Sequence, residues 1–186
     1  PSLPPLHPES RERAKALAPF HGGAHIIVLA QVLGEEPEKT AGLARQLIEV
    51  GLAEHMGDNH LRLDPALPSY LLRGMDEGER ESLREHWAEA MARLTVFLYQ
   101  QRGQDAGLSS RLTILELPNL LTLLRRAEDR LLPEEVVSLA GLVERLLSSL
   151  GQPRAMAEAV AVRERAARKL AGWGDVQFLA GHAELG

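Results

Sequence analysis

The stretch LARQLIEVGLAEHMGDNHLRLDPALPSYLL, residues 43–72, decides the fold of this chain. Its first part has the apolar spacing of a helix, and Gly51 is a natural residue to end that helix. A short segment with a polar tip at Asp58 and Asn59 follows, and its composition is typical of a β-hairpin. Pro65 then marks the start of another helix. The stretch therefore predicts a helix, a hairpin and a helix, in that order.

This order is the core of a winged-helix unit, which we expect over residues 9–73. With Asp58 and Asn59 as the turn, residue 56 faces residue 61, and residue 54 faces residue 63. The register places Leu52, Met56, Leu61 and Leu63 on one face, with Glu54 as the exception, and Ala53, His55, Arg62 and Asp64 on the other. We predict that the apolar face packs on helices and that the polar face is solvent-exposed.

Proline, glycine and acidic residues mark out the remaining helices. Four prolines in residues 1–8 indicate a linker. Asp76 and Glu79 form a capping box that opens a long helix. The apolar stripe of that helix is Leu83, Trp87, Ala90, Met91, Leu94, Phe97 and Leu98. The sequence predicts helices over residues 9–17, 24–33, 38–50, 76–102, 133–150 and 153–170, and a leucine-dense segment, 108–127, in which Pro118 starts a new helix or kinks one.

A weak internal repeat occurs in the C-terminal part of the chain. The pair Leu150-Gly151 recurs 35 residues later as Leu185-Gly186. Helix-pair repeats of the tetratricopeptide type have a period of about 34 residues. Ala159 and Ala166 provide the small residues with which the second helix of such a repeat packs. We therefore expect residues 74–186 to form antiparallel helical hairpins, the start of a tetratricopeptide-like array that continues past Gly186.

Composition excludes several classes of protein. Of the 186 residues, 45% are hydrophobic and only 4% aromatic, which favours a mainly α protein with a core of Leu, Ala and Val. The absence of cysteine excludes disulfides, thiolate nucleophiles and cysteine-bound zinc. No apolar run is long enough to span a membrane, and the N-terminus has no apolar signal segment. We expect a cytoplasmic protein that does not bind membranes.

Few residues are candidates for catalysis or for binding a metal or cofactor. His21 and His25 have a four-residue spacing that two metal ligands on one helix would have, but Gly22 and Gly23 between them disfavour a helix. Ordinary loop or core positions explain these histidines better. We predict no catalytic, cofactor-binding or metal-binding residue, no cofactor and no enzyme activity.

Five further positions have structural explanations. His55 and His60 flank the predicted hairpin tip and are expected to be solvated. Glu134 and Glu135 suit the first turn of a helix through its dipole, without a catalytic role. Trp173 follows Gly172 in a predicted turn between helices, where it either packs in the core or forms part of a contact patch.

DNA binding is the alternative function, because the third helix of many winged helices lies in the major groove. The corresponding helix here, residues 38–50, carries Lys39 and Arg45 against Glu38 and Glu49, and two more glutamates precede it. A helix that reads DNA needs a surplus of positive charge near the phosphates. This helix lacks such a surplus, and the net charge of −5 on the whole chain also disfavours DNA binding. We therefore prefer a protein partner to a nucleic acid.

Several segments together resemble the region that follows the nucleotide-binding domain in STAND-class signalling ATPases of the NB-ARC type. They are FHGGAHIIVLAQVLG (residues 20–34), LARQLIEVGL (43–52), HLRLDPALPSYLL (60–72) and ELPNLL (116–121). The resemblance covers residues 9–186. It implies a winged helix followed by sensor repeats, and two kinds of protein partner: the nucleotide-binding domain of the same protein and an unidentified protein or peptide.

Two departures from the family pattern bear on function. The chain contains no GxxxxGK[ST] phosphate loop, so it is not the ATPase module itself. The family also often places a histidine that reads a bound ADP phosphate where the strand meets the Pro-containing helix. Asp64 occupies that position here, and a carboxylate repels phosphate. We expect a non-catalytic interaction and regulatory region of a larger signalling protein.

Overall fold

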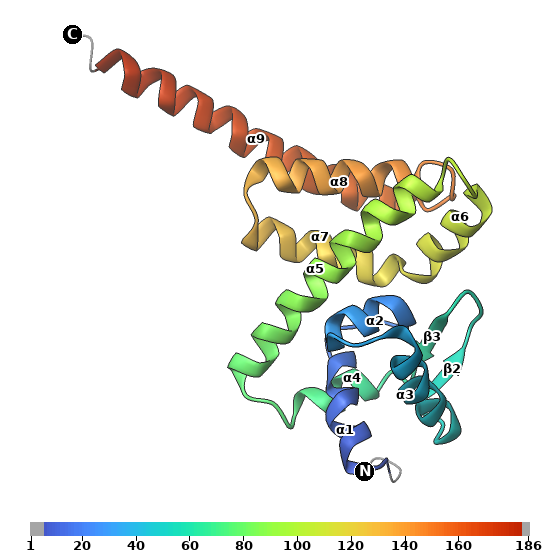
Figure 1. Cartoon of the computed structure of the whole chain (residues 1–186). Coiled ribbons are helices and arrows are strands. Elements are labelled where there is room, and N and C mark those ends of the chain that lie inside the picture. The colour runs from blue at the N-terminus through green and yellow to red at the C-terminus, as the bar shows by residue number, and fades with distance from the viewer. Residues whose placement is uncertain (1–5, 184–186) are drawn as a thin grey trace. The chain divides into compact units, whose positions relative to one another are not determined.

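The computed structural model describes the backbone of residues 6–183 and the side chains of residues 6–172. The protein is mainly α, with 72% helix, and a small three-stranded antiparallel sheet near its N-terminus is followed by packed helices (Figure 1). The chain forms two compact units, residues 1–119 and 120–186. The predicted assignment of residues 9–73 to a winged helix and 74–186 to a helical array stays a prediction.

The N-terminal unit begins with α1 (Pro8–Ala14), the 3-10 turn η1 (Lys15–Leu17), β1 (Gly23–His25), α2 (Ile26–Leu33) and α3 (Pro37–Glu49). The helices agree with the sequence prediction, except that Ala24 and His25 belong to a strand rather than to α2. Gly34 and Gly51 follow α2 and α3 with positive φ angles of 63° and 73°. A side chain disfavours this left-handed conformation, which explains the glycines that end these two helices.

The predicted hairpin exists, as β2 (Ala53–His55) and β3 (His60–Leu63), but its register was predicted wrongly by one residue. His55, not Met56, faces Leu61, because the loop contains a third left-handed residue, Gly57, ahead of Asp58 and Asn59. The slip leaves Met56 42% exposed and buries Ala53, which was predicted to face solvent. β1 pairs with the other edge of β3, so the hairpin belongs to a three-stranded sheet of order β1-β3-β2.

Three helices follow the hairpin in the N-terminal unit: α4 (Leu67–Leu72), α5 (Glu77–Gln101) and α6 (Ala106–Leu115). α4 begins two residues after Pro65, with Pro68 in its first turn. The capping box that opens α5 is present as predicted. Trp87 is a core residue, 1% exposed, and packs edge-on against Phe20 with ring centroids 6.4 Å apart. Phe97 was predicted to lie on the buried stripe but is 45% exposed.

The C-terminal unit consists of most of α7 (Leu117–Arg130), with α8 (Pro133–Leu147) and α9 (Pro153–Ala183). Pro118 lies in the first turn of α7, so it starts a new helix. α8 packs along α9, and the predicted small residues Ala159 and Ala166 are buried on α9 (Figure 1). The predicted turn at Gly172 and Trp173 is wrong, because α9 continues to Ala183. This continuity removes the helix break that a second repeat would need, and Gly186 lies outside the described residues.

Candidate functional site

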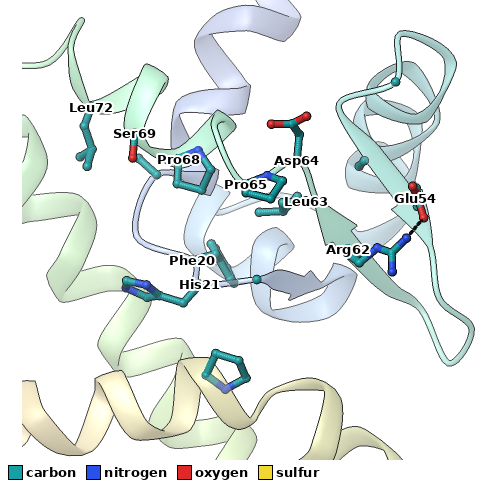
Figure 2. A pocket seen from close by; sticks show the side chains of 15 residues that line it. Phe20, His21, Glu54, Arg62, Leu63, Asp64, Pro65, Pro68, Ser69 and Leu72 are labelled. Atoms are coloured by element: carbon teal, nitrogen blue, oxygen red, sulfur yellow. Dashed lines mark hydrogen bonds and ion pairs between the residues drawn. The ribbon is translucent and has the colours of Figure 1, made fainter.

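The N-terminal unit contains a pocket of about 760 Å³ between the sheet, α4 and the loop before β1 (Figure 2). Its wall is mainly apolar and proline-rich, comprising Ala18, Phe20, Leu63, Pro65, Pro68, Leu72 and Pro118. Phe20 is anchored in the core with no exposed surface, so this side of the pocket is rigid. The proline rings fix their own backbone φ angles, which further limits the motion of the wall beside α4.

Polar groups at the rim of the pocket are satisfied by their neighbours. Arg62 on β3 donates to Glu54 on β2, and Figure 2 shows this ion pair across the two strands. Asp64 accepts a hydrogen bond from the backbone N–H of Ala66 at 2.8 Å and so organises the turn into α4. The carboxylate of Asp64, at the position where the resembling family often has histidine, therefore has a local structural role. The rim offers no surplus positive charge for a phosphate.

A buried asparagine holds the loop that forms one edge of this pocket. Asn119 has no exposed surface, and its Oδ1 accepts a hydrogen bond from the backbone N–H of His21 at 2.7 Å. Its Nδ2 donates to the carbonyl oxygen of Gly23 at 2.9 Å. Both bonds join positions almost a hundred residues apart in the sequence, with separations of 98 and 96. Asn119 thus fixes the start of β1 against the first turn of α7.

Glu116 extends this connection to the rest of β1 and is likewise fully buried. Its Oε1 accepts the backbone N–H of His25 at 2.9 Å, and its Oε2 accepts Nδ2 of Asn119 at 2.6 Å. Nε2 of His60 lies 3.3 Å from Oε1, although the angle does not make a hydrogen bond. Because a buried carboxylate costs several kcal/mol unless polar groups surround it, these contacts stabilise a charge that water does not reach. We call Glu116, Asn119, His25 and His60 the buried polar cluster.

Close packing within this cluster requires a glycine at position 23. A Cβ atom on Gly23 would lie 2.2 Å from Cε1 of His60 and 2.6 Å from the carbonyl oxygen of Leu61. These two residues belong to β3, the strand that pairs with β1. The absence of a side chain at Gly23 therefore allows β1 and β3 to approach with the ring of His60 next to Gly23.

The other histidine of the cluster, His25, links β1 to α2. Its Nδ1 accepts the backbone N–H of Ile27 at 3.3 Å and caps the first turn of α2. Burial lowers the pKa of His25, and this effect outweighs the nearby carboxylate of Glu116, which acts in the opposite direction. The neutral imidazole that results retains the lone pair that the cap requires.

The predicted site residues have structural roles in the described part of the chain. His21 is exposed in the loop before β1 and His25 is buried, and residues 6–172 contain no group of three or more histidine and carboxylate side chains arranged to hold a metal. His60 was predicted to be solvated but is 2% exposed, because β1 and Glu116 cover the face of β3 on which it lies. Glu135 accepts the backbone N–H of Leu132 at 3.0 Å, as a residue in a first helical turn does.

Sequence reasoning missed the buried polar cluster. The available signal was the segment Glu116–Asn119, in which two polar side chains interrupt a leucine-rich run and flank a proline. A polar residue at an apolar position is more informative than an apolar residue on the surface. Trp173, the remaining candidate, lies within α9 rather than in a turn.

No protein-family model matches this chain, and no curated protein or solved structure matches it either. In addition, none of the described helices combines the length and the hydrophobicity needed to cross a membrane. A functional assignment therefore has to start from the arrangement of the strands, the pocket and the charges.

Proposed function

We propose that this chain is a non-catalytic interaction and regulatory region of a larger STAND-class signalling protein, and that its N-terminal unit is a winged helix. The sheet is the observation that supports this proposal most directly. Its elements follow the order α1, β1, α2, α3, β2, β3, and the short β1 pairs with β3 to make the sheet order β1-β3-β2. A winged helix has this order and this pairing, with β2 and β3 as the wing.

The charges of the N-terminal unit favour a protein partner over DNA. The exposed charges of α3 balance, with Glu38 and Glu49 against Lys39 and Arg45. Lys39 is also within 3.5 Å of Glu35. A helix that neutralises DNA phosphates needs an excess of cations, and each phosphate contact contributes to a steep salt dependence. This helix does not have that excess.

The wing is also occupied by contacts within its own unit. Arg111 on α6 donates from Nε to Oδ2 of Asp58, at the tip of the wing, at 2.8 Å. Arg62, a basic residue of the wing, is paired with Glu54. A wing that reaches into a groove of DNA would have to release these pairs. Their presence supports a wing that serves as a packing element.

The apolar pocket is the surface that we assign to the nucleotide-binding domain of the same protein. Its proline-rich wall is concave and rigid, and binding surfaces of this kind exclude water from a few anchoring side chains. The helices α8 and α9 pack against each other, and we assign the second protein or peptide partner to this helical part. The regulatory mechanism would be restraint of the ATPase domain by contact with the winged helix.

A binding experiment with the nucleotide-binding domain encoded upstream tests the proposal. Ser69 is exposed at the edge of the pocket, so Ser69→Arg fills the hollow without removing a core contact. We expect this variant to weaken binding by about tenfold or more, as measured by calorimetry. Met56→Arg is the matched control, because Met56 is exposed on the wing and does not line the pocket. Equal affinities for the two variants would show that the pocket is not the contact.

A gel shift with random duplex DNA tests the alternative function. At physiological salt we expect no retardation, because the charges of α3 and of the wing are balanced. Retardation that weakens steeply as salt increases would instead assign the winged helix to DNA.

A further inference from the structure

A second hollow of about 330 Å³ lies where α1, η1 and α4 meet, in the N-terminal unit. Its lining consists of Arg11, Lys15, Tyr70, Leu71, Arg73 and Gly74. α4 packs directly against η1, with Leu17 and Leu71 buried in the contact. The hollow is separate from the proline-rich pocket, with which it shares no lining residue.

Three of the six lining residues are cations, and none is a carboxylate. The chain as a whole carries a net charge of −5, so this concentration of positive charge is a local feature. Lys15 is paired with the exposed Glu12 at 2.7 Å. Among the described side chains of residues 6–172, the guanidinium groups of Arg11 and Arg73 take part in no hydrogen bond or ion pair. Both remain available to a ligand.

The backbone that carries Arg73 is held in place by neighbouring groups. The N–H of Arg73 donates to the carbonyl of Tyr70 at 3.2 Å, and Arg80 donates to the carbonyl of Leu72 at 2.7 Å. Met75, just beyond the hollow, is 6% exposed and anchors the turn in the core. The backbone at Arg73 is therefore held in place before any ligand binds, which lowers that part of the entropic cost of binding.

The acidic residues that follow this turn are engaged elsewhere. Asp76 accepts the backbone N–H of Glu79 at 2.8 Å in the capping box of α5, and the side chain of Glu79 returns the contact at 3.0 Å. Glu77 is paired with Arg80 and with Arg84, at 3.4 and 3.1 Å. Of the carboxylates on α1 and at the start of α5, Glu12 is the one with a contact to a cation of the hollow. An incoming anion would compete with Glu12 and also with Glu79, whose charge acts on Lys15.

From these features we propose that the hollow binds a phosphate monoester carried on an aromatic or apolar body. A guanidinium group presents paired N–H donors that match a phosphate, and two such groups with one ammonium suit a dianion better than a single carboxylate. Tyr70 and Leu71 provide an apolar wall for the body of the ligand, and Tyr70 adds a hydroxyl group. The volume is at the lower end of the range for small-molecule sites, about 300–1,000 Å³.

Titration with phenyl phosphate tests this proposal, with the arginine Nε–Hε signals of the labelled protein as the NMR readout. We expect saturable shifts of Arg11 and Arg73, with a Kd of about 1 mM or lower. Inorganic phosphate should bind more weakly because it lacks the aromatic body. Binding should strengthen as the pH rises through about 6, where the monoester becomes a dianion. Benzenesulfonate, a monoanion over the whole range, should bind weakly at every pH.

Substitution of the two arginines separates a site from general attraction between charges. Arg11→Gln and Arg73→Gln should each weaken phenyl phosphate by about tenfold. Arg45→Gln is the matched control, because Arg45 is an exposed arginine on α3 outside the hollow, and it should leave the affinity unchanged. Three results would each overturn the proposal: no saturation at about 10 mM, ten times the expected Kd; shifts of Arg45 as large as those of Arg11; or equal binding of benzenesulfonate.

Discussion

The two units of this protein are stabilised by different kinds of interaction. In the N-terminal unit, β1, β3 and the start of α7 meet at a fully buried carboxylate, a fully buried amide and two buried histidines. In the C-terminal unit, α8 and α9 pack through aliphatic side chains such as Val143 and Val162, and the charged pairs lie toward solvent. Both units are compact, but the first depends on directional contacts and the second on apolar area.

This difference predicts how each unit responds to change. A buried hydrogen bond to a charged group requires one geometry, and loss of one partner leaves the other desolvated. Aliphatic packing has no such directionality, and cores tolerate substitutions that conserve volume. The N-terminal unit should therefore be specific and sensitive, and the C-terminal unit tolerant.

Asn119→Ala should have the largest effect. The substitution removes two hydrogen bonds to the β1 segment and a third to Glu116, whose charge stays buried. We expect the free energy of unfolding of the N-terminal unit to fall by about 3–5 kcal/mol. Urea unfolding followed through Trp87 fluorescence, in a Trp173→Phe background, reports on this unit. Ser138→Ala on α8 is the control, since its exposed hydroxyl bonds only within its own helix; a similar loss there would invalidate the comparison.

Gly23→Ala should be the next most harmful change. The added methyl group would meet a backbone oxygen at 2.6 Å as well as the ring of His60, and the backbone of a paired strand cannot easily move away. We expect a loss of about 2–3 kcal/mol in the same unfolding assay. Gly42→Ala on α3 is matched to it, because a Cβ there meets no atom within 4 Å. The free energy of unfolding of that variant should rise by about 0.5–1 kcal/mol, because alanine has the higher helix propensity. A fall in the free energy of unfolding at both positions would contradict the steric explanation.

The helices of this protein could largely be predicted from its sequence, whereas the sheet and the cluster could not. Gly34, Gly51 and the capping box at Asp76 are local signals, and the helices end or begin there. β1 has only three residues and runs directly into an apolar helix, so periodicity cannot separate the two. The hairpin register depended on whether the turn has two or three left-handed residues, and Gly57 was the third.

The buried polar cluster could not be predicted from local sequence patterns, for a different reason. His60 is buried because Glu116 and β1 cover it, and the hydrogen bond between Glu116 and the adjoining strand spans 91 positions in the sequence. A single sequence contains no information on which distant polar residue will meet a given histidine. Gly172 likewise indicated a turn, but α9 continues through it to Ala183.

Leu146→Met tests the tolerance of the C-terminal unit. Leu146 is 3% exposed, and methionine has nearly the same volume with greater flexibility. We expect the free energy of unfolding of this unit to fall by less than about 1.5 kcal/mol. Hydrogen exchange of the α8 amides measures it. A loss as large as that of Asn119→Ala would show that the C-terminal core is as specific as the buried polar cluster.

Acidification should weaken the N-terminal unit before the C-terminal unit. Burial lowers the pKa of His25 below its ordinary value of 6.5. Just below pH 6.5, His25 is therefore protonated in the unfolded chain but neutral in the folded chain. The stability that this group contributes is complete above about 6.5 and is lost as the pH falls below that value. The charged or titratable groups that act on His25 are Glu116, His60 and Asp58. Between pH 7.5 and 5.5, the stability of the N-terminal unit, measured by urea unfolding through Trp87 fluorescence, should therefore fall more than that of the C-terminal unit, measured by hydrogen exchange of the α8 amides. His25→Gln should make the fall in the N-terminal unit smaller.

The smallest effect on stability should come from two surface arginines, one in each unit. Arg111 bonds Asp58 in the β2–β3 hairpin loop and Arg165 bonds Glu128 on α7, and both arginines are about half exposed, at 59% and 47%. Exposed ion pairs of this kind contribute little to stability, so Arg111→Gln and Arg165→Gln should leave both unfolding transitions nearly unchanged. Their pKa effects should still be visible by NMR. Hydrogen bonds from the arginines lower the pKa of Asp58 and of Glu128, and each pKa should rise toward its ordinary value in the matching variant alone. Because Arg111 holds the hairpin loop to α6 whereas Arg165 joins α7 to α9, only Arg111→Gln should speed hydrogen exchange in the hairpin loop.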